Sequence, residues 1–295
     1  MKEYLLRSLM FLPAHNEKYL RSASNSDADV LVLDLEDSVP SKDNKQIARD
    51  KIKQWIKNGE FKNRTIFVRI NERASGELLK DVFQLTIPGV TGFIYPKAYT
   101  AKDIYFMDKL LDTIEYEKGI KKRTFKLIPI IETCEAVLNA KKIAKASKRN
   151  IAIIYGSEDH ISDLQGIHDK EHDTLFTPRA IIAMAARAAH IAPIDASHVN
   201  VHDLDDLVVN LKISNKLGYD GMVVLNPVEL ELVHQYFTPS EEKVAKAKEM
   251  LQLAKIANKA GKGVAMIDGI FIGPPMVKAA EKTLFIYKKI KAKKQ

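Results

Sequence analysis

Short apolar segments alternate with longer amphipathic segments along the whole chain. Most of the short segments are continuous runs of β-branched and other apolar residues, which is typical of strands that are buried on both faces. Eight such segments are found, at residues 7–13, 30–36, 64–70, 92–97, 126–133, 151–159, 196–201 and 221–227. The seventh is the weakest of these predictions, because the segment is short and polar.

The segments between the strands have the periodicity of amphipathic helices. They include Asp43–Lys57, Ala101–Leu111, Ala136–Ala146, Pro178–Ala189 and Asp203–Leu217. Pro178 and Asp203 suit the start of a helix, and Gly218 suits the position after a helix ends. Eight strands that alternate with helices predict the α/β class and, within it, a (β/α)8 TIM barrel. An open, doubly wound sheet is the alternative, but such a sheet usually has fewer strands.

The pattern changes after the eighth strand. Val228–Phe237 completes the barrel as its last helix, so we expect the catalytic barrel domain to cover residues 1–237. Residues 238–295 exceed what a barrel needs and predict a C-terminal helical extension, with Ser240 as the N-cap of its first helix. The glycine-rich segment 260–275 predicts a mobile lid, and the lysine-rich end of the chain predicts a basic, solvated tail.

Composition excludes several classes of protein. The 295 residues are 46% hydrophobic, which is ordinary for a globular protein and excludes a disordered chain. The single cysteine, Cys134, excludes a disulfide scaffold, a zinc ribbon and a CxxC redox site. No apolar stretch approaches the ~18–20 residues that span a bilayer. Because the N-terminus also lacks the pattern of a signal peptide, we expect a cytoplasmic protein without a membrane partner.

The formal net charge of +8 is unevenly distributed. Five of the positive charges come from lysines in the last eight residues, which leaves +3 for the rest of the chain. That remainder contains no basic stripe interleaved with aromatic residues. We therefore do not expect a nucleic-acid partner.

Charged residues follow several predicted strands, at the end where a barrel of this kind carries its active site. They are Glu36 and Asp37 after the second strand, Arg69 after the third, Lys97 after the fourth, Glu132 after the fifth, and Glu158 and Asp159 after the sixth. So many charges at one rim are costly unless they bind something. Carboxylates without cysteines or paired histidines beside them favour a hard divalent cation, and magnesium fits best. Arg69 is suited to hold a substrate carboxylate through two parallel hydrogen bonds.

Structural roles are the alternative for some of these residues. The acidic cluster at residues 34–37 could end a strand and pair with Arg7 or Arg49. For Lys97, a Schiff base is the alternative to a simple contact with a phosphate or a carboxylate. The eight histidines show neither the HxxxH nor the HExxH spacing of a metal site.

A series of short motifs follows in order along nearly the whole chain. The motifs are Arg7–Ala14, Leu33–Val39, Lys45–Arg49, Val68–Asn71, Pro96–Lys97, Ile131–Thr133, Gly156–Asp159, Ala185–Ala189, Leu217–Gly221, Phe237–Ser240 and the segment 261–269. Together they resemble the motifs of the citrate lyase β-chain-like family of carbon–carbon lyases, part of the HpcH/HpaI aldolase superfamily. That family includes citrate lyase β subunits and the malyl-CoA and citramalyl-CoA lyases.

The resemblance implies a (β/α)8 barrel with a C-terminal extension, assembled as a homo-oligomer that is a trimer or a hexamer. It also implies a proton-transfer role for Asp268, in the site of a neighbouring subunit. The catalytic residues that we expect are Arg69, Asp268, Glu36 and Asp37. The expected substrate-binding residues are Arg69, Lys97, Gly156 and Pro227, and the expected ligands of Mg²⁺ are Glu132 and Asp159.

The activity that the resemblance implies is Mg²⁺-dependent cleavage or formation of a hydroxy-acyl-CoA. Citramalyl-CoA, malyl-CoA or a citryl thioester would give a 2-oxo acid and an acetyl thioester. The family's usual Ile-His-Pro-x-Gln is Leu225–Glu229 here, and its Pro-Gly is Pro13-Ala14. Because these positions lie near the thioester end of the family's pocket, two alternatives stay open. One is an aldolase that acts on a free hydroxy or 2-oxo acid without CoA, and the other is a non-catalytic barrel subunit of a lyase complex.

Overall fold

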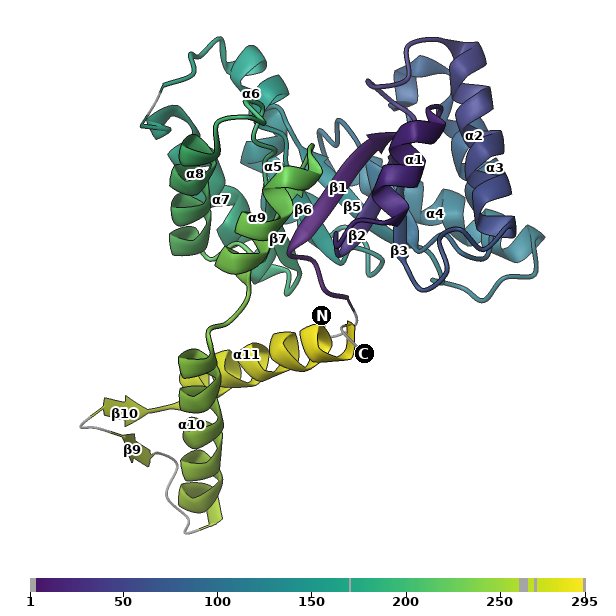
Figure 1. Ribbon diagram of the computed structural model, residues 1–295. Helices are drawn as coiled ribbons and strands as arrows, with labels where there is room; N and C mark the ends of the chain where they lie inside the picture. The colour runs from purple at the N-terminus through teal and green to yellow at the C-terminus, as the bar shows by residue number, and fades with distance from the viewer. Residues whose placement is uncertain (1–3, 170, 260–264, 268–269, 294–295) are drawn as a thin grey trace. The chain divides into compact units, whose positions relative to one another are not determined.

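The computed structural model describes residues 4–169, 171–259, 265–267 and 270–293. Eight parallel strands form a closed barrel in sequence order, and the intervening helices lie around it (Figure 1). The strands are β1 (Ser8–Pro13), β2 (Val30–Asp34), β3 (Thr65–Arg69), β4 (Gly92–Tyr95), β5 (Lys126–Ile131), β6 (Ala152–Tyr155), β7 (Ala192–Asp195) and β8 (Gly221–Val224). The predicted (β/α)8 TIM barrel is therefore confirmed.

Helices follow the strands with the local signals that the sequence suggested. They are α1 (Glu17–Ser24), α2 (Lys42–Lys57), α3 (Leu78–Leu85), α4 (Ala101–Glu117), α5 (Cys134–Lys145), α6 (Ser157–Leu164), α7 (Asp173–Ala188), α8 (Leu204–Leu217) and α9 (Leu230–Phe237). The Asp203 side chain caps the N-terminus of α8, and Gly218 ends that helix with a φ of 81°. A short 3₁₀ turn, Pro227–Glu229, leads from β8 into α9.

The seventh strand and two neighbouring boundaries differ from the sequence prediction. β7 is Ala192–Asp195, and residues 196–201 form the loop after it. Asp195 fits inside a buried strand because its carboxylate accepts hydrogen bonds from Arg179, at 3.1 Å, and from Ser214. Pro178 lies inside α7 and does not start that helix. Residues 157–159, predicted as the end of the sixth strand, begin α6.

Buried arginines pair with carboxylates outside the barrel wall. The guanidinium of Arg149 lies 2.6 Å from Glu115 and 2.7 Å from Asp112. Arg49 binds Asp81 at 2.6 Å and Glu77 at 2.9 Å. Because a buried guanidinium is costly without such partners, these pairs fix how α2, α3 and α4 lie against the strands. The wall that they support holds the strand ends of the site.

The chain divides into two compact units, and the first is the barrel, Leu6–His234. The second contains α10 (Glu241–Lys259), β9 (Ala265–Ile267), β10 (Ile270–Ile272) and α11 (Pro274–Lys293). Ser240 Oγ accepts a hydrogen bond from the backbone N–H of Lys243, as expected of the N-cap. One expectation needs correction here: β9 and β10 pair antiparallel within the segment predicted as a loop. Most of the terminal lysines lie in the last turns of α11.

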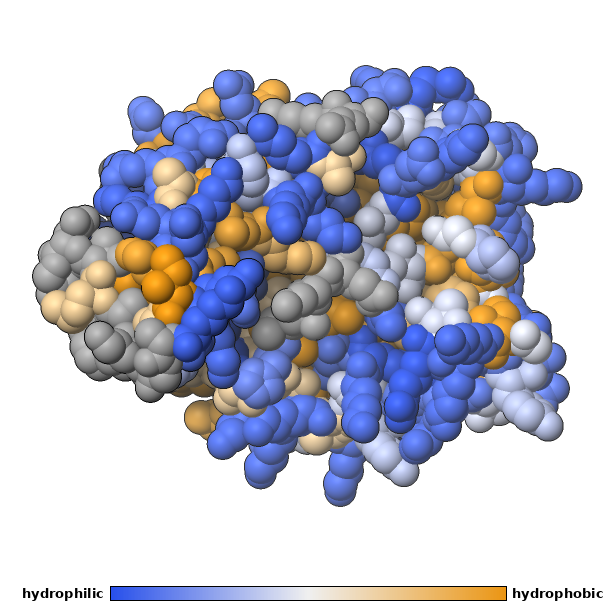
Figure 2. Space-filling model, turned by 90° about the horizontal axis from the view of Figure 1, so that it is seen from below, coloured by the Kyte–Doolittle hydropathy of each residue, from blue (hydrophilic) through white to orange (hydrophobic). Residues whose placement is uncertain are grey.

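Hydrophilic side chains cover most of the face drawn in Figure 2, with apolar residues in scattered groups. Long lysine and glutamate side chains on helices such as α10 account for this kind of surface. Among the described residues, no helix combines the length and the hydropathy that a membrane crossing requires.

Candidate active site

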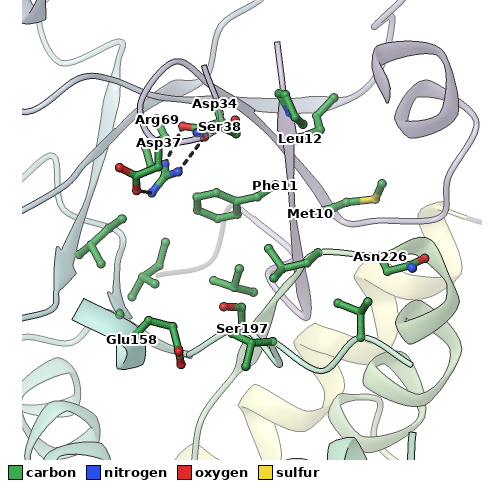
Figure 3. A pocket seen from close by; sticks show the side chains of 18 of the residues that line it. Met10, Phe11, Leu12, Asp34, Asp37, Ser38, Arg69, Glu158, Ser197 and Asn226 are labelled. Carbon is green, nitrogen blue, oxygen red and sulfur yellow. Dashed lines mark hydrogen bonds and ion pairs between the residues drawn. The ribbon is translucent and has the colours of Figure 1, made fainter. Parts of the chain in front are cut away.

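A cavity of about 660 Å³ opens at the carboxyl ends of the barrel strands. Arg69 and Asp34 lie at one end of it and Asn226 at the other, with the ring of Phe11 between them (Figure 3). The carboxyl ends of parallel strands in such a barrel all face the same way, which is why residues so distant in sequence meet here. Of the expected site residues, the cavity wall contains Asp37, Arg69, Glu132, Gly156, Asp159 and Pro227.

Arg69 is the centre of a buried charge cluster. Its Nε and Nη2 atoms donate hydrogen bonds of 2.6 and 2.7 Å to the two carboxylate oxygens of Asp34. Burial opposes ionisation of Asp34, but Arg69 and the hydroxyl of Ser38 hold the pKa of Asp34 below its usual value. The interpretation that this acidic cluster pairs with Arg7 or Arg49 is wrong, because Arg7 binds Asp29 at 2.8 Å and Arg49 binds α3.

The third nitrogen of the guanidinium faces the other two acids of the cluster. Arg69 Nη1 lies 3.0 Å from Glu36 Oε2 and 3.1 Å from Asp37 Oδ2. Asp37 is 63% exposed, whereas Glu36 is 7% exposed. The two-pronged edge of Arg69 is thus occupied by Asp34, and Nη1 is the nitrogen that faces the exposed Asp37.

Glu36 is a buried acid in a crowded, mainly negative environment. Burial raises the pKa of Glu36 to about 8; the positive Arg69 opposes this, and the negative Asp37 and Glu132 add to it. A carboxyl with such a pKa carries its proton near neutral pH. Glu36 is therefore suited to hold or pass a proton, as general acids and bases with a pKa near the working pH do.

Glu132 is held in place by two features of the backbone around it. The N–H of Lys97, a residue with a left-handed φ of 49°, donates a hydrogen bond to Glu132 Oε1. A Cβ at Gly156 would lie 2.6 Å from Glu132 Cβ and 2.9 Å from Oε2, so only glycine leaves room for this carboxylate. Burial, with the nearby Asp159 adding to it, raises the pKa of Glu132 to about 7.

Asp159 brings a second carboxylate to the same wall of the cavity. It lies in the first turn of α6, after the N-cap Gly156, and is exposed. The described part of the chain holds no group of three Asp, Glu, His or Cys side chains able to bind a metal. Two carboxylates, with the remaining positions left to water and substrate oxygens, are the kind of ligand set that Mg²⁺ takes.

The other expected residues occupy different positions. Lys97 Nζ lies 3.4 Å from Glu72 Oε2 and 3.7 Å from Glu36 Oε1. Burial lowers the pKa of this amine, but the nearby carboxylates of Glu36 and Glu72 more than offset that effect. The pKa of Lys97 therefore lies above its usual value. A protonated amine does not favour the Schiff-base alternative. Asp268 lies outside the described residues.

Sequence reasoning missed one side of the cavity. Lys18 and Tyr19 of α1 and Ser197 and Val199 of the β7–α8 loop line it. In the sequence, Lys18 and Tyr19 look like any residues on the solvated face of a helix, so no signal marked them as cavity residues. The loop was assigned to a strand, which concealed its position at the rim.

A family model described as HpcH/HpaI aldolase/citrate lyase matches residues 7–227. Citrate lyase subunit beta of Haemophilus influenzae is 31% identical, over 95% of this chain and 96% of that protein. The mitochondrial citramalyl-CoA lyase of Mus musculus is 26% identical, over 97% and 87%. The structure of protein CitE from Mycobacterium tuberculosis in complex with magnesium, acetoacetate and coenzyme A is 25% identical, with a TM-score of 0.72 over 97% and 99%. The resemblance seen in the motifs is confirmed.

The raised pKa of Glu36 predicts a pH-dependent stability. The folded state keeps a proton that the unfolded state loses near pH 4.5, so the free energy of unfolding should fall as the pH rises from there to about 8. Glu36→Gln has no such proton. Relative to that variant, the wild type should lose up to about 1.4 kcal/mol per pH unit. Urea unfolding in EDTA between about pH 5 and 8 measures this, with the exposed Glu17→Gln as the control. Parallel curves for wild type and Glu36→Gln would show that Glu36 is ionised throughout.

Proposed function

The chain belongs to the HpcH/HpaI aldolase/citrate lyase family, and on that premise we propose that it is a Mg²⁺-dependent carbon–carbon lyase. The proposed reaction cleaves, or in reverse forms, a hydroxy-acyl thioester, giving a 2-oxo acid and an acetyl thioester. One observation carries the proposal: two carboxylates and a partly buried arginine, each at or after a different strand end, line one cavity of the barrel. The barrel, Leu6–His234, is proposed as the catalytic domain.

Glu132 and Asp159 are the proposed ligands of Mg²⁺. Glu132 has one hydrogen bond from the protein, at Oε1, and its Oε2 lies in the space that Gly156 leaves. When bound, the metal ion supplies Lewis-acid polarisation of the substrate's carboxylate and hydroxyl oxygens and lowers the pKa of the hydroxyl. The relative solved in complex with magnesium, acetoacetate and coenzyme A supports Mg²⁺ as the ion.

Arg69 is proposed to bind the carboxylate that becomes part of the 2-oxo acid. Because Asp34 occupies Nε and Nη2, the ligand would take Nη1 from Asp37. The released Asp37 carboxylate is then available to accept the proton of the substrate hydroxyl. As the C–C bond breaks, the hydroxyl carbon becomes the carbonyl of the 2-oxo acid, and the electron pair passes to the acetyl thioester as an enolate.

The opposite end of the cavity is proposed to hold the thioester. Phe11, whose ring lies between Arg69 and Asn226 (Figure 3), contributes apolar wall together with Leu12 and Val223. At about 660 Å³ the cavity exceeds what a three- or four-carbon acid fills. This favours an extended substrate over the alternative of a free acid. The relative named citramalyl-CoA lyase has, by its name, a CoA thioester as its substrate.

The first test is magnesium binding. Glu132→Gln and Asp159→Asn each remove one of two carboxylates, so each should weaken Mg²⁺ binding by about tenfold or more, which is about 1.4 kcal/mol. Titration calorimetry measures this in the intact protein. Glu158→Gln is the matched control, because Glu158 lines the same cavity but pairs with His168 at 3.1 Å. Unchanged affinity in both test variants would place the metal elsewhere.

The second test separates the role of Arg69 from that of Asp37. Arg69→Lys should weaken binding of pyruvate by roughly 1–3 kcal/mol, since lysine keeps the charge but loses the planar fork. Asp37→Asn should instead tighten pyruvate binding, because the competing carboxylate on Nη1 is gone, while turnover falls for lack of a proton acceptor. Calorimetry with Mg²⁺ present gives the affinities. Weaker pyruvate binding in Asp37→Asn would contradict binding at Nη1.

The third test concerns assembly. We propose a homo-oligomer, a trimer or a hexamer, in which Asp268 of one subunit protonates the enolate in a neighbour's barrel. Asp268→Asn and Glu132→Gln subunits should each be inactive. When they are dissociated and reassociated together, some sites should combine an intact barrel with an intact Asp268 and recover activity. Absence of recovery, with mixed oligomers confirmed by native mass spectrometry, would refute a shared site.

A further inference from the structure

Two loops form the cavity wall at the Asn226 end. The loop after β7 contributes Ser197 and Val199, and the loop after β8 contributes Leu225, Asn226 and Pro227. Both loops are outside regular secondary structure where they face the cavity, apart from the 3₁₀ turn that begins at Pro227. Their shape therefore depends on side-chain contacts rather than on a backbone ladder.

Glu229 fixes the backbone of the second loop. Its Oε2 accepts hydrogen bonds of 3.0 Å from the N–H groups of both Leu225 and Asn226. The side chain of Asn226 in turn accepts a bond from Val228 N–H, which completes a capping box. Glu229 is 1% exposed, so its charge needs a partner inside the protein.

His198 is that partner, and it belongs to the first loop. Its Nε2 lies at a hydrogen-bond distance of 2.9 Å from Asp206 Oδ2 on α8. Its Nδ1 lies 3.5 Å from Glu229 Oε1, an ion-pair contact between two buried atoms that make no hydrogen bond with the described residues. The ring is 4% exposed, and its chain neighbours are the two cavity residues Ser197 and Val199. A buried imidazole with a carboxylate at each nitrogen can be paired at both only when both nitrogens carry protons.

The charges around the ring favour that state. Burial lowers the pKa of His198, but Glu229 and Asp206 offset the effect and leave its pKa above the usual value. Asp206 is shared with His172, whose Nε2 lies 2.9 Å from Asp206 Oδ1. The pairing of His198 is complete below its pKa and is lost as the pH rises through it.

We propose that His198, bridging Glu229 and Asp206, is a positioning residue that ties the β7 and β8 loops together and so shapes the thioester end of the cavity. The identity of the ligand at this end rests on the proposed function; the bridge itself does not. The Arg69 end lies across the cavity from Asn226 (Figure 3), so the bridge acts on thioester binding and leaves small oxo acids unaffected.

Three variants separate charge from packing. Glu229→Gln keeps an oxygen to accept from Leu225 and Asn226 but removes the negative charge facing His198. His198→Gln keeps a polar side chain but cannot carry the positive charge. His202→Gln is the matched control, because His202 is an exposed histidine four residues along the same loop.

The first readout needs no substrate. NMR titration of ¹³C-labelled histidines should give His198 a pKa above the usual value in the wild type and a lower one in Glu229→Gln. Hydrogen-exchange mass spectrometry should show lower protection at residues 225–226 in His198→Gln. In the wild type, protection corrected for the base-catalysed rise of the intrinsic exchange rate should fall as the pH passes the pKa of His198. The bridge would be overturned if His198 had its usual pKa in both the wild type and Glu229→Gln. It would also be overturned if amide exchange at residues 225–226 did not change with the protonation of His198.

The second readout is binding. Calorimetry with acetyl-CoA should show about tenfold weaker binding in His198→Gln and in Glu229→Gln, while pyruvate with Mg²⁺ binds as in the wild type. His202→Gln should match the wild type in both. Equal losses for both ligands, or none for acetyl-CoA, would overturn the positioning role. If acetyl-CoA fails to bind even the wild type, the thioester substrate is wrong, and the titration and exchange data still decide whether the bridge exists.

Discussion

The positive charge of one partly buried guanidinium, that of Arg69, offsets the negative charge of the acids at the mouth of this barrel. Parallel pairing of β2 with β3 places Asp34 directly beside Arg69. Two hydrogen bonds from the guanidinium to the Asp34 carboxylate then join the two strands. Glu36 lies against the same guanidinium, although it has almost no access to water. Without Arg69, the buried carboxylate of Asp34 would lose its two-pronged partner, and an unpaired buried ion costs several kcal/mol. The geometry of the site thus depends on this one cation and on the strand register that positions it.

The cavity has two ends with different physical characters. At the Arg69 end, Asp34 and Arg69 lie on paired strands, Glu132 directly follows β5, and Asp159 lies in the first turn of α6, so regular elements of the barrel position these side chains. At the Asn226 end, loops supply them, and buried contacts among His198, Glu229 and Asp206 replace the missing ladder. Metal and oxo-acid chemistry needs precise oxygen positions, whereas an extended thioester needs a wall of suitable shape. The distribution of rigid and loop-borne residues matches that division.

Sequence patterns predicted the parts of the fold that burial alone determines. Continuous apolar runs such as Val30–Leu33 have one stable location, the barrel wall, and their charged ends identify the rim. β7 was not predicted because proline and aspartate, here Pro193 and Asp195, are rare in strands. Asp195 is stable there because Arg179, which is distant in the sequence, donates a hydrogen bond to it. The occupation of Arg69 by Asp34 and the pairing of His198 with Glu229 are contacts between distant segments, which leave no periodic trace in the sequence.

Gly156 shows how a residue without a functional group can set the tolerance of a site. A hydrogen atom stands where any other residue would carry a carbon, within 3 Å of the Glu132 carboxylate. The space at Gly156 lets Glu132 take the position in which it accepts the hydrogen bond from Lys97 N–H. A designer who transplants Glu132 and Asp159 to another barrel must therefore also keep a glycine at the position of Gly156.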